Sequence, residues 1–354
     1  MSAASAAQAL DLPAIDAAAR MLEQGLLVAF PTETVYGLGA DASNPAALAR
    51  IYEAKGRPSD HPLIVHLSPQ AELEHWATDI PDEARRLAQA FWPGPLTLIL
   101  QRAAGVPDAV SAGQSTIGLR CPSHPVALAL LQAFRQGQGG IAGPSANRFG
   151  HVSPTSAQHV RDEFGAHHPL IGCILEGGQS AVGIESTIID LSRLQSHGPV
   201  LLRPGKLTAR EIGDVLGRTV TMPDQSAPRV SGTLAAHYAP ATALALVPGE
   251  RLDAVLAALA AQRRRIALMH YSPLPAVDGV AASTVASIRV QADPAAYAHA
   301  LYANLRVLDQ AAADLIVVET PPTDAGWEAV NDRLRRSAHD SSGMLARMLG
   351  QQAV

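Results

Sequence analysis

The sequence predicts an α/β protein with a large mixed sheet followed by a smaller α/β domain. Helix and strand patterns are interspersed over the first two-thirds of the chain, separated by tight Pro and Gly turns. This arrangement favours one twisted mixed sheet over regular strand–helix–strand repeats. A proline-rich stretch without periodicity follows at residues 219–241. Beyond it, strands and helices alternate again, as is typical of a small doubly wound, Rossmann-like domain.

The larger domain starts with an amphipathic helix and a buried strand. Residues 14–24 place apolar side chains on one face before Gly25, and residues 26–30 are continuously apolar. The same patterns predict the elements that follow. We expect helices at 45–54, 82–91 and 126–134, and strands at 62–67, 96–100 and 116–119.

Two capping boxes predict where later helices begin. Thr155 with Gln158 opens a helix that runs to residue 164, and Thr208 with Glu211 opens one that ends near Gly217. Between these helices we expect strands at 184–191 and 200–202.

The change of pattern after residue 217 predicts the domain boundaries. We expect the first domain at 10–217, a linker that covers its site at 218–241, and the small Rossmann-like domain at 242–354. In the last of these we expect strands at 243–247, 266–270 and 315–319 and helices at 252–261 and 294–312.

Length and composition exclude several classes of protein. A chain of 354 residues suits two domains at roughly 150 residues each. The net charge of −5 argues against a nonspecific nucleic-acid coat. Two cysteines give neither a disulfide framework nor zinc spacing. The N-terminus lacks signal-peptide features and no apolar run reaches about 18 residues, so we expect a cytoplasmic protein without membrane segments.

Seven short polar motifs, most of which follow a predicted strand, indicate one binding site. Strand ends of α/β proteins face the crevice where ligands bind, so we expect these loops to converge. The motifs are Pro31-Thr32-Glu33-Thr34-Val35-Tyr36-Gly37, Lys55-Gly56-Arg57-Pro58, His66, Thr116-Ile117-Gly118-Leu119-Arg120, Gly143-Pro144-Ser145-Ala146-Asn147, Glu185-Ser186-Thr187 and Leu202-Arg203-Pro204-Gly205.

The basic residues of these motifs indicate an anionic ligand. Lys55, Arg57, Arg120 and Arg203 each lie in a turn or at a strand end, where the backbone is held. A guanidinium fits carboxylate or phosphate, and an ammonium supplies a compact charge for a polyphosphate. The loop that carries Ser145 and Asn147 adds a hydroxyl, an amide and backbone N–H groups, which are the parts of an anion cradle.

Other kinds of site find no support in the sequence. His61 and His66 are an odd number of positions apart on a strand and face opposite sides, and no other histidines have metal-ligand spacing. The segment after Gly37 is too far from its strand for a dinucleotide fingerprint, and no nucleophile elbow is present. We therefore expect an enzyme that positions reactants and neutralises charge.

Taken together and in this order, the motifs resemble those of the YrdC-like threonylcarbamoyl-AMP synthases, in the longer branch with a C-terminal α/β domain. The resemblance implies a YrdC-like twisted mixed sheet whose helices form a concave cationic pocket. It implies an enzyme that condenses L-threonine, bicarbonate and ATP, with Mg²⁺, to threonylcarbamoyl-AMP and pyrophosphate. Separate proteins would then transfer the group to tRNAs reading codons that begin with A, so we expect weak or indirect tRNA binding.

The resemblance also assigns residues to the two halves of the site. It implies a threonine side formed by Thr34, His66, Arg120, the backbone of Gly143, and Ser186. It implies an ATP side formed by Arg57, His61, Thr116, Ser145, Ser153, Arg203 and Tyr238, to which the cradle argument adds Asn147. Lys55 and Arg57 are the expected catalytic residues, because they would spread the charge that develops on the phosphates.

The chain departs from the family pattern at two points. His61 stands where the family usually has Asn, and an imidazole titrates near neutral pH. The segment before His237 and Tyr238 lacks the basic residues that many relatives carry there. The transfer of a role to Tyr238 is therefore weaker than the transfer to Arg57 or Ser145.

Two other functions compete with this interpretation. A noncatalytic RNA-binding protein would use the same concave face, but the acidic net charge and the lack of an aromatic, basic stripe count against it. A carbamoyl-transfer module of the hydrogenase-maturation type would need zinc-finger cysteine pairs, and this chain has two isolated cysteines.

Overall fold

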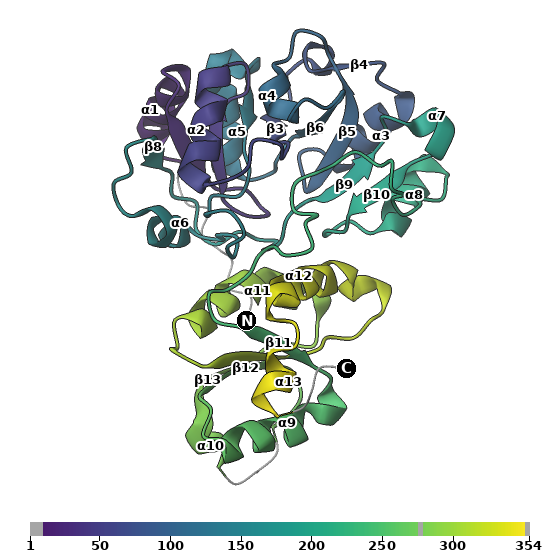
Figure 1. Ribbon diagram of the computed structural model, residues 1–354. Coiled ribbons are helices and arrows are strands. Elements are labelled where there is room, and N and C mark those ends of the chain that lie inside the picture. The colour runs from purple at the N-terminus through teal and green to yellow at the C-terminus, as the bar shows by residue number, and fades with distance from the viewer. Residues whose placement is uncertain (1–9, 275–278, 351–354) are drawn as a thin grey trace, which may run out of the picture.

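The computed structural model describes residues 10–274 and 279–350, which form two sheets (Figure 1). The larger sheet has ten strands in the order β10-β9-β5-β6-β3-β7-β2-β1-β8, with β4 paired to β5. Its strands are β1 (Leu27–Phe30), β2 (Gly37–Asp41), β3 (Ile64–Leu67), β4 (Ala77–Thr78), β5 (Leu96–Arg102), β6 (Thr116–Arg120), β7 (Gly140–Ala142), β8 (Ile171–Ile174), β9 (Thr187–Asp190) and β10 (Val200–Arg203).

The sheet is mixed, as the sequence predicts. The pairs β1–β8, β3–β6 and β5–β9 are parallel, and the other pairs are antiparallel. The helices around it are α1 (Leu12–Glu23), α2 (Pro45–Lys55), α3 (Asp82–Phe91), α4 (Asp108–Ser111), α5 (Pro125–Ala133), α6 (Ala157–Phe164), α7 (Leu194–His197) and α8 (Ala209–Leu216).

Helices cover both faces of the sheet at β1. Val28 and Phe30 belong to a core with α1 and α5, whereas Leu27 and Ala29 belong to the core that includes α2. This is the period of two expected when successive strand residues point to opposite faces. At the far end of the sheet, Val230 packs with residues of β5, β9 and β10, so the segment after α8 covers part of that face.

Strand β2 was not predicted, because two of its residues are glycines. A Cβ at Gly37 would lie 3.0 Å from the Phe30 ring, and one at Gly39 would lie 2.8 Å from Ile141. Glycine therefore lets large neighbouring side chains lie over this strand. The local sequence shows only that glycine lowers the strand propensity. It does not show the packing against Phe30 and Ile141 that requires glycine at these positions.

The smaller sheet is parallel and doubly wound, as predicted. Its order is β11-β14-β12-β13, and alternate residues of β14 face different cores: Ile316 and Val318 pack with α11 and α12, and Leu315 and Val317 pack with α9. Its elements are β11 (Leu244–Val247), α9 (Gly249–Ala261), β12 (Ile266–His270), α10 (Val280–Ser283), β13 (Thr284–Arg289), α11 (Pro294–Asp309), β14 (Leu315–Glu319), α12 (Glu328–Ala338) and α13 (Met344–Met348).

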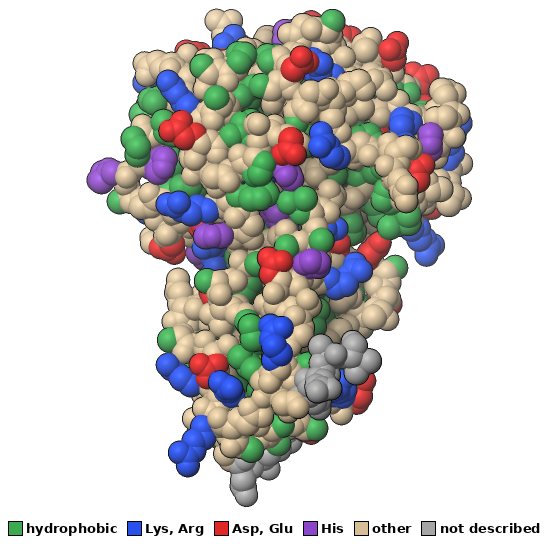
Figure 2. Space-filling view, viewed as in Figure 1, with side chains coloured by type: hydrophobic (Ala, Val, Ile, Leu, Met, Phe, Trp, Pro, Cys, Tyr) green, Lys and Arg blue, Asp and Glu red, His purple; other side chains and the backbone are tan. Residues whose placement is uncertain are grey.

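One hydrophobic core joins the two sheets. Val35, Val152 and Val182 from the larger part pack in the same cluster as Tyr302 of α11. Gly183 lies directly against the backbone of α11, since a Cβ there would be 2.5 Å from the carbonyl oxygen of Ala298. In Figure 2 the broad upper part and the narrower lower part meet along this contact. The predicted boundaries at 217 and 241 stay a prediction.

The two predicted capping boxes have different outcomes. The Thr208 side chain accepts from the Glu211 N–H while the Glu211 carboxylate accepts from the Thr208 N–H, so this box is confirmed. The box at Thr155 is wrong: the cap of α6 is Ser156, whose side chain accepts from the N–H of His159.

Within residues 10–274 and 279–350, no helix combines the length and apolar character needed to cross a bilayer.

We predict that Gly183→Ala destabilises the contact between the two parts. Gly183 has φ +82° and no room for a Cβ, whereas Gly178 has φ +70° and no atom within 4 Å of a Cβ. Gly178→Ala should therefore cost only the left-handed backbone, about 1–2 kcal/mol, and Gly183→Ala should cost clearly more. Urea unfolding followed by circular dichroism measures both, and equal losses would contradict the close approach to α11.

Candidate functional site

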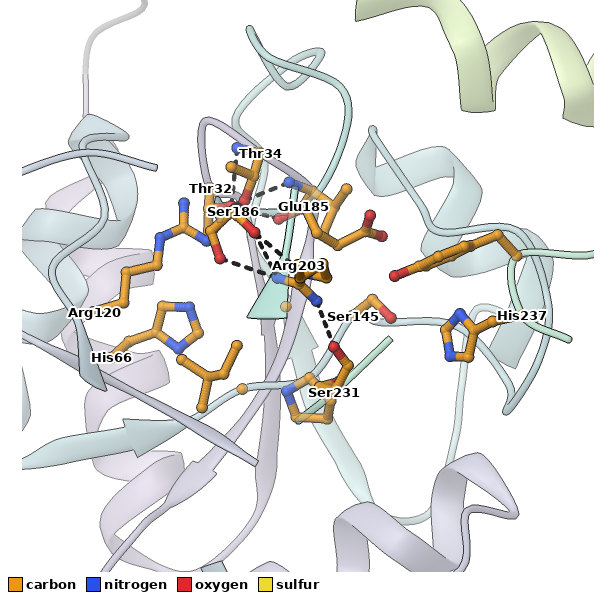
Figure 3. A pocket seen from close by; sticks show the side chains of 16 residues that line it. Thr32, Thr34, His66, Arg120, Ser145, Glu185, Ser186, Arg203, Ser231 and His237 are labelled. Carbon is orange, nitrogen blue, oxygen red and sulfur yellow. Dashed lines mark hydrogen bonds between the residues drawn. The ribbon is translucent and has the colours of Figure 1, made fainter. Parts of the chain in front are cut away.

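The loops at the strand ends enclose a small cavity of about 40 Å³ (Figure 3). Its walls come from the loop after β1, the end of β6, the loop after β7, the loop before β9, the end of β10 and the segment at 231–238. The lining residues are Thr32, Thr34, Val35, Gly37, Ile64, His66, Arg120, Gly143, Pro144, Ser145, Glu185, Ser186, Arg203, Ser231, His237 and Tyr238.

Arg120 is held rigidly at the end of β6. Its Nη1 donates to the Thr34 hydroxyl at 2.9 Å, its Nη2 donates to a Glu33 oxygen at 2.6 Å, and its Nε donates to the Gly94 carbonyl at 3.3 Å. These bonds use three of the five N–H groups of a guanidinium. One N–H remains on each terminal nitrogen to donate to a ligand carboxylate.

His66 is a buried, neutral side chain beside Arg120. Its Nδ1 lies 3.3 Å from the Ile141 carbonyl oxygen. Its ring and the Phe30 ring are nearly perpendicular, with their centroids 5.5 Å apart. Burial, followed by repulsion from Arg120, lowers the pKa of His66 to about 3. The imidazole is therefore uncharged at neutral pH and adds a polar wall without a second positive charge.

Arg203 connects Ser186 to the segment at 231–238. Its Nη2 donates to the carbonyl and the hydroxyl of Ser186, each at 3.0 Å, and its Nη1 donates to the Ser231 carbonyl at 2.8 Å. The Ser186 hydroxyl also lies 2.8 Å from that of Thr97. The position of Ser186 is thus fixed by Thr97 of β5 and by Arg203 of β10.

His237 lies across the cavity from Arg120 (Figure 3), and Tyr238, next to it in the chain, lines the same cavity. Tyr238 is buried, adopts φ +62°, and has its hydroxyl 3.5 Å from the Gly232 carbonyl. Two bonds to α12 hold this pair: the His237 N–H donates to the Arg336 carbonyl, and the Ser337 hydroxyl donates to the Tyr238 carbonyl. The segment is part of the pocket wall in this structure.

Lys55 and Arg57 lie behind the lining residues. The Lys55 ammonium donates to the carbonyls of Ser145 and Asn147, so it holds the loop after β7 in place. Burial, with repulsion from Arg57, holds the pKa of Lys55 well below its ordinary value. Arg57 donates to the Pro62 carbonyl at 3.0 Å, and its buried Nε has no partner among the described residues.

The predicted threonine side is brought together completely, and the predicted ATP side only in part. Thr34, His66, Arg120, Gly143 and Ser186 all line the cavity. On the ATP side, the cavity is lined by Ser145, Arg203 and Tyr238. The structure places the other predicted residues outside the lining: Lys55, Arg57, His61, Thr116, Asn147 and Ser153. Their roles stay predictions.

Sequence reasoning missed several lining residues. Thr32 stands in the first motif, where only Thr34 was singled out, and its hydroxyl accepts from two backbone N–H groups of its own loop. Ser231 lies in the linker and has no local signal for a place in the lining. Glu185 stands in a recognised motif, where only Ser186 was singled out. Its carboxylate accepts from the Ser153 hydroxyl at 2.6 Å, which the motif alone does not reveal.

Some of the charges around the cavity are paired, and the site does not fit a metal held by the protein. Arg120 and Arg203 line it together with Glu185, and Arg120 is paired with Glu33, so a cationic pocket stays a prediction. Glu185 is paired with Arg333. Across the described residues, no group of three or more His, Cys, Asp or Glu side chains could hold a metal ion.

Fold and site together define a two-part α/β protein with a small-molecule pocket at the strand ends of a twisted mixed sheet. Residues 20–205 match the family model described as Telomere recombination, and residues 207–339 match the model described as Threonylcarbamoyl-AMP synthase, C-terminal domain. The chain belongs to the threonylcarbamoyl-AMP synthase family, which confirms the predicted membership.

Individual relatives span nearly the whole chain. The threonylcarbamoyl-AMP synthase of Pyrococcus abyssi (strain GE5 / Orsay) is 39% identical and is aligned over 91% of this chain and 93% of the relative. That of Bacillus subtilis (strain 168) is also 39% identical, over 92% and 93%. The crystal structure of P. abyssi Sua5 complexed with L-threonine superposes with a TM-score of 0.84 at 35% identity, covering 94% of this chain and 96% of that one.

We predict that the His66 imidazole does not titrate between pH 5 and pH 8, because burial and Arg120 lower its pKa to about 3. Unfolded, it would take up a proton near pH 6.5. The free energy of unfolding should therefore fall as the pH drops below about 6.5, by roughly 1.4 kcal/mol per pH unit for this group. NMR of the imidazole resonances measures the titration midpoint of His66. The variant His66→Gln assigns the His66 signal, and urea-unfolded protein is the control. A midpoint above pH 5 would contradict the buried neutral state.

Proposed function

We propose that this chain condenses L-threonine, bicarbonate and ATP to L-threonylcarbamoyl-AMP and pyrophosphate. The observation that carries the proposal is that Thr34, His66, Arg120, Gly143 and Ser186 line one cavity, where Arg120 keeps one N–H on each terminal nitrogen. It is supported by the relative solved with L-threonine, which covers 94% of this chain.

Threonine binds through both of its ends. Its carboxylate takes the two remaining N–H groups of Arg120, one on each terminal nitrogen. Its hydroxyl bonds to Thr34 or Ser186, whose side chains line the same cavity. The amine is then left to react, and a site that satisfies the substrate hydroxyl rejects valine because a buried polar group would be left unpaired.

The reaction adds a carbamate and then an adenylate. Bicarbonate and the threonine amine give the carbamate with loss of water, and a carbamate oxygen attacks the α-phosphorus of ATP. The bond from that phosphorus to the bridging oxygen breaks, and pyrophosphate leaves in line. Arg203 and Arg57 offset the growing negative charge, so the protein acts by positioning and electrostatics.

The ATP side is proposed from residues at two depths. Ser145, Arg203 and Tyr238 line the cavity, while Arg57, His61, Thr116, Asn147 and Ser153 surround it. Lys55 contributes by holding the carbonyls of the loop that presents Ser145. Mg²⁺ is proposed only as a companion of ATP, whose phosphate oxygens are its preferred ligands.

The linker is proposed to open when ATP enters. A cavity of about 40 Å³ has room for only about three water molecules, and Ser231, His237 and Tyr238 form one of its walls. This supports the division into a catalytic domain at 10–217, a covering linker at 218–241 and a second domain at 242–354. We further propose that this chain is cytoplasmic and that separate tRNA-modifying proteins use its product, with weak or indirect tRNA contact by this chain.

The first test is pyrophosphate release from Mg-ATP and bicarbonate, with L-threonine, with L-valine or with neither. We expect release that requires threonine and bicarbonate. With valine, release should fall by a factor of about 10⁴, as for sites built around a substrate hydroxyl. Pyrophosphate release that does not depend on threonine would contradict the proposal. Binding of tRNA without any threonine-dependent pyrophosphate release would favour the RNA-binding alternative.

Arg120→Ala should weaken the use of threonine far more than the binding of ATP. Losing a bidentate, charge-assisted contact should raise the KM for threonine about 100-fold, and that for ATP less than about threefold. Arg120→Lys should recover only part of the loss, because an ammonium cannot bind both carboxylate oxygens in the same way. Equal changes in both KM values would show that Arg120 does not bind the carboxylate.

A further inference from the structure

Arg333 of α12 belongs to the smaller sheet's part of the chain but ends against the cavity wall of the larger part. The residue is completely buried. Its Nε donates to a Glu185 oxygen at 2.8 Å, and its Nη2 donates to the Pro204 carbonyl at 3.0 Å. Its guanidinium carbon lies 5.4 Å from the centre of the Tyr238 ring. One side chain therefore touches three segments of the pocket.

Arg333 forms ion pairs with two carboxylates, that of Asp332 in its own helix at 2.8 Å and that of Glu185 in the cavity wall at 2.8 Å. The Glu185 carboxylate is the one that reaches the cavity. This carboxylate accepts from the hydroxyls of Ser153 at 2.6 Å and Tyr302 at 2.9 Å (Figure 3 shows Glu185 in the wall). Burial alone would raise the pKa of Glu185, but attraction to Arg333 and Arg203 and the hydrogen bonds outweigh burial and lower it to about 2. Glu185 is thus ionised at neutral pH.

An ionised carboxylate in this wall creates a conflict with the proposed substrate. ATP brings several negative charges to the side of the cavity where Arg203 and Ser145 lie, and like charges in a dry site repel strongly. Of the groups that bond to the Glu185 carboxylate, Tyr302 and Arg333 come from α11 and α12. Neutralisation of this wall therefore depends on the second part of the chain.

We infer that Arg333, assisted by Tyr302, is a positioning residue for ATP, through which the second domain completes the nucleotide side of the site. Arg333 compensates the charge of Glu185 and holds its oxygens toward Ser153. It also supports the wall formed by Pro204 and Tyr238. The inference rests on the proposed function, because it assigns the role within that reaction.

The test is a double-mutant cycle on ATP binding. Arg333→Met removes the ion-pair partner of Glu185 and leaves only the weaker compensation by Arg203, so the Kd for ATP, measured by calorimetry, should rise at least about tenfold. The Kd for threonine should change less than about twofold, because Arg120 is untouched. Glu185→Gln in the Arg333→Met background should recover most of the ATP affinity, which simple loss of packing would not allow.

Two milder variants keep the test decisive if Arg333→Met does not fold. Tyr302→Phe removes one bond to Glu185 and should raise the Kd for ATP about threefold, with no effect in the Glu185→Gln background. Arg333→Lys keeps the charge and should lie between wild type and Arg333→Met. No change in ATP affinity for any of these variants would overturn the inference.

Arg306 offers a matched control from the same part of the chain. It donates to Glu163 at 2.8 Å and to the Val152 carbonyl, so it also forms a partly buried ion pair with the larger part, but neither Arg306 nor Glu163 lines the cavity. Arg306→Met should change the Kd for ATP less than about threefold. A loss equal to that of Arg333→Met would show that general loosening of the two parts explains the effect.

The outcome also separates the inference from the function on which it rests. Wild-type protein that shows no threonine-dependent pyrophosphate release would remove the proposed reaction. Wild-type protein that reacts, together with Arg333→Met that binds ATP normally, would keep the reaction and remove the role of Arg333.

Discussion

The burial of guanidinium groups is the constraint on which the rest of this structure depends. Arg120, Arg203 and Arg333 are each at most 4% exposed. A buried charge is tolerated only when its N–H groups find partners. The protein meets this need with carbonyls and carboxylates from loops that are distant in sequence, including Glu33, Ser186, Ser231 and Glu185. These bonds fix where each loop lies, and hence the shape of the cavity.

The second part of the chain is structurally continuous with this site. A single apolar cluster contains Val35 and Ile184 beside the cavity together with Leu301 and Val330 of α11 and α12. The ion pairs Arg333–Glu185 and Arg306–Glu163 cross the same boundary. Apolar packing brings the parts together, and the polar pairs set their register, because a misplaced buried charge costs more than a misplaced methyl group.

Local chemistry made much of the architecture predictable. Asn44, Pro45 and Gly56 are all typical of the helix ends that they form around α2, and the Thr208 capping box lies where the sequence places it. The meeting of Thr34, His66, Arg120, Gly143 and Ser186 at one cavity was also predictable, because each stands in a motif next to a strand, and their roles toward threonine stay predictions. Strand β2 was missed because its glycines are explained only by the packing of Phe30 and Ile141. Arg333 was missed because nothing within α12 indicates that its partner is Glu185, 148 residues earlier in the chain.

Tyr238 shows that the closed wall is not the lowest-energy backbone for its segment. Its φ of +62° lies in the left-handed region, where a residue with a Cβ is disfavoured by about 1–2 kcal/mol. Hydrogen bonds to Gly232 and to Ser337 of α12 hold it there and offset this torsional cost. The place of Tyr238 in the cavity wall therefore depends on contacts made by a helix of the smaller sheet's part of the chain.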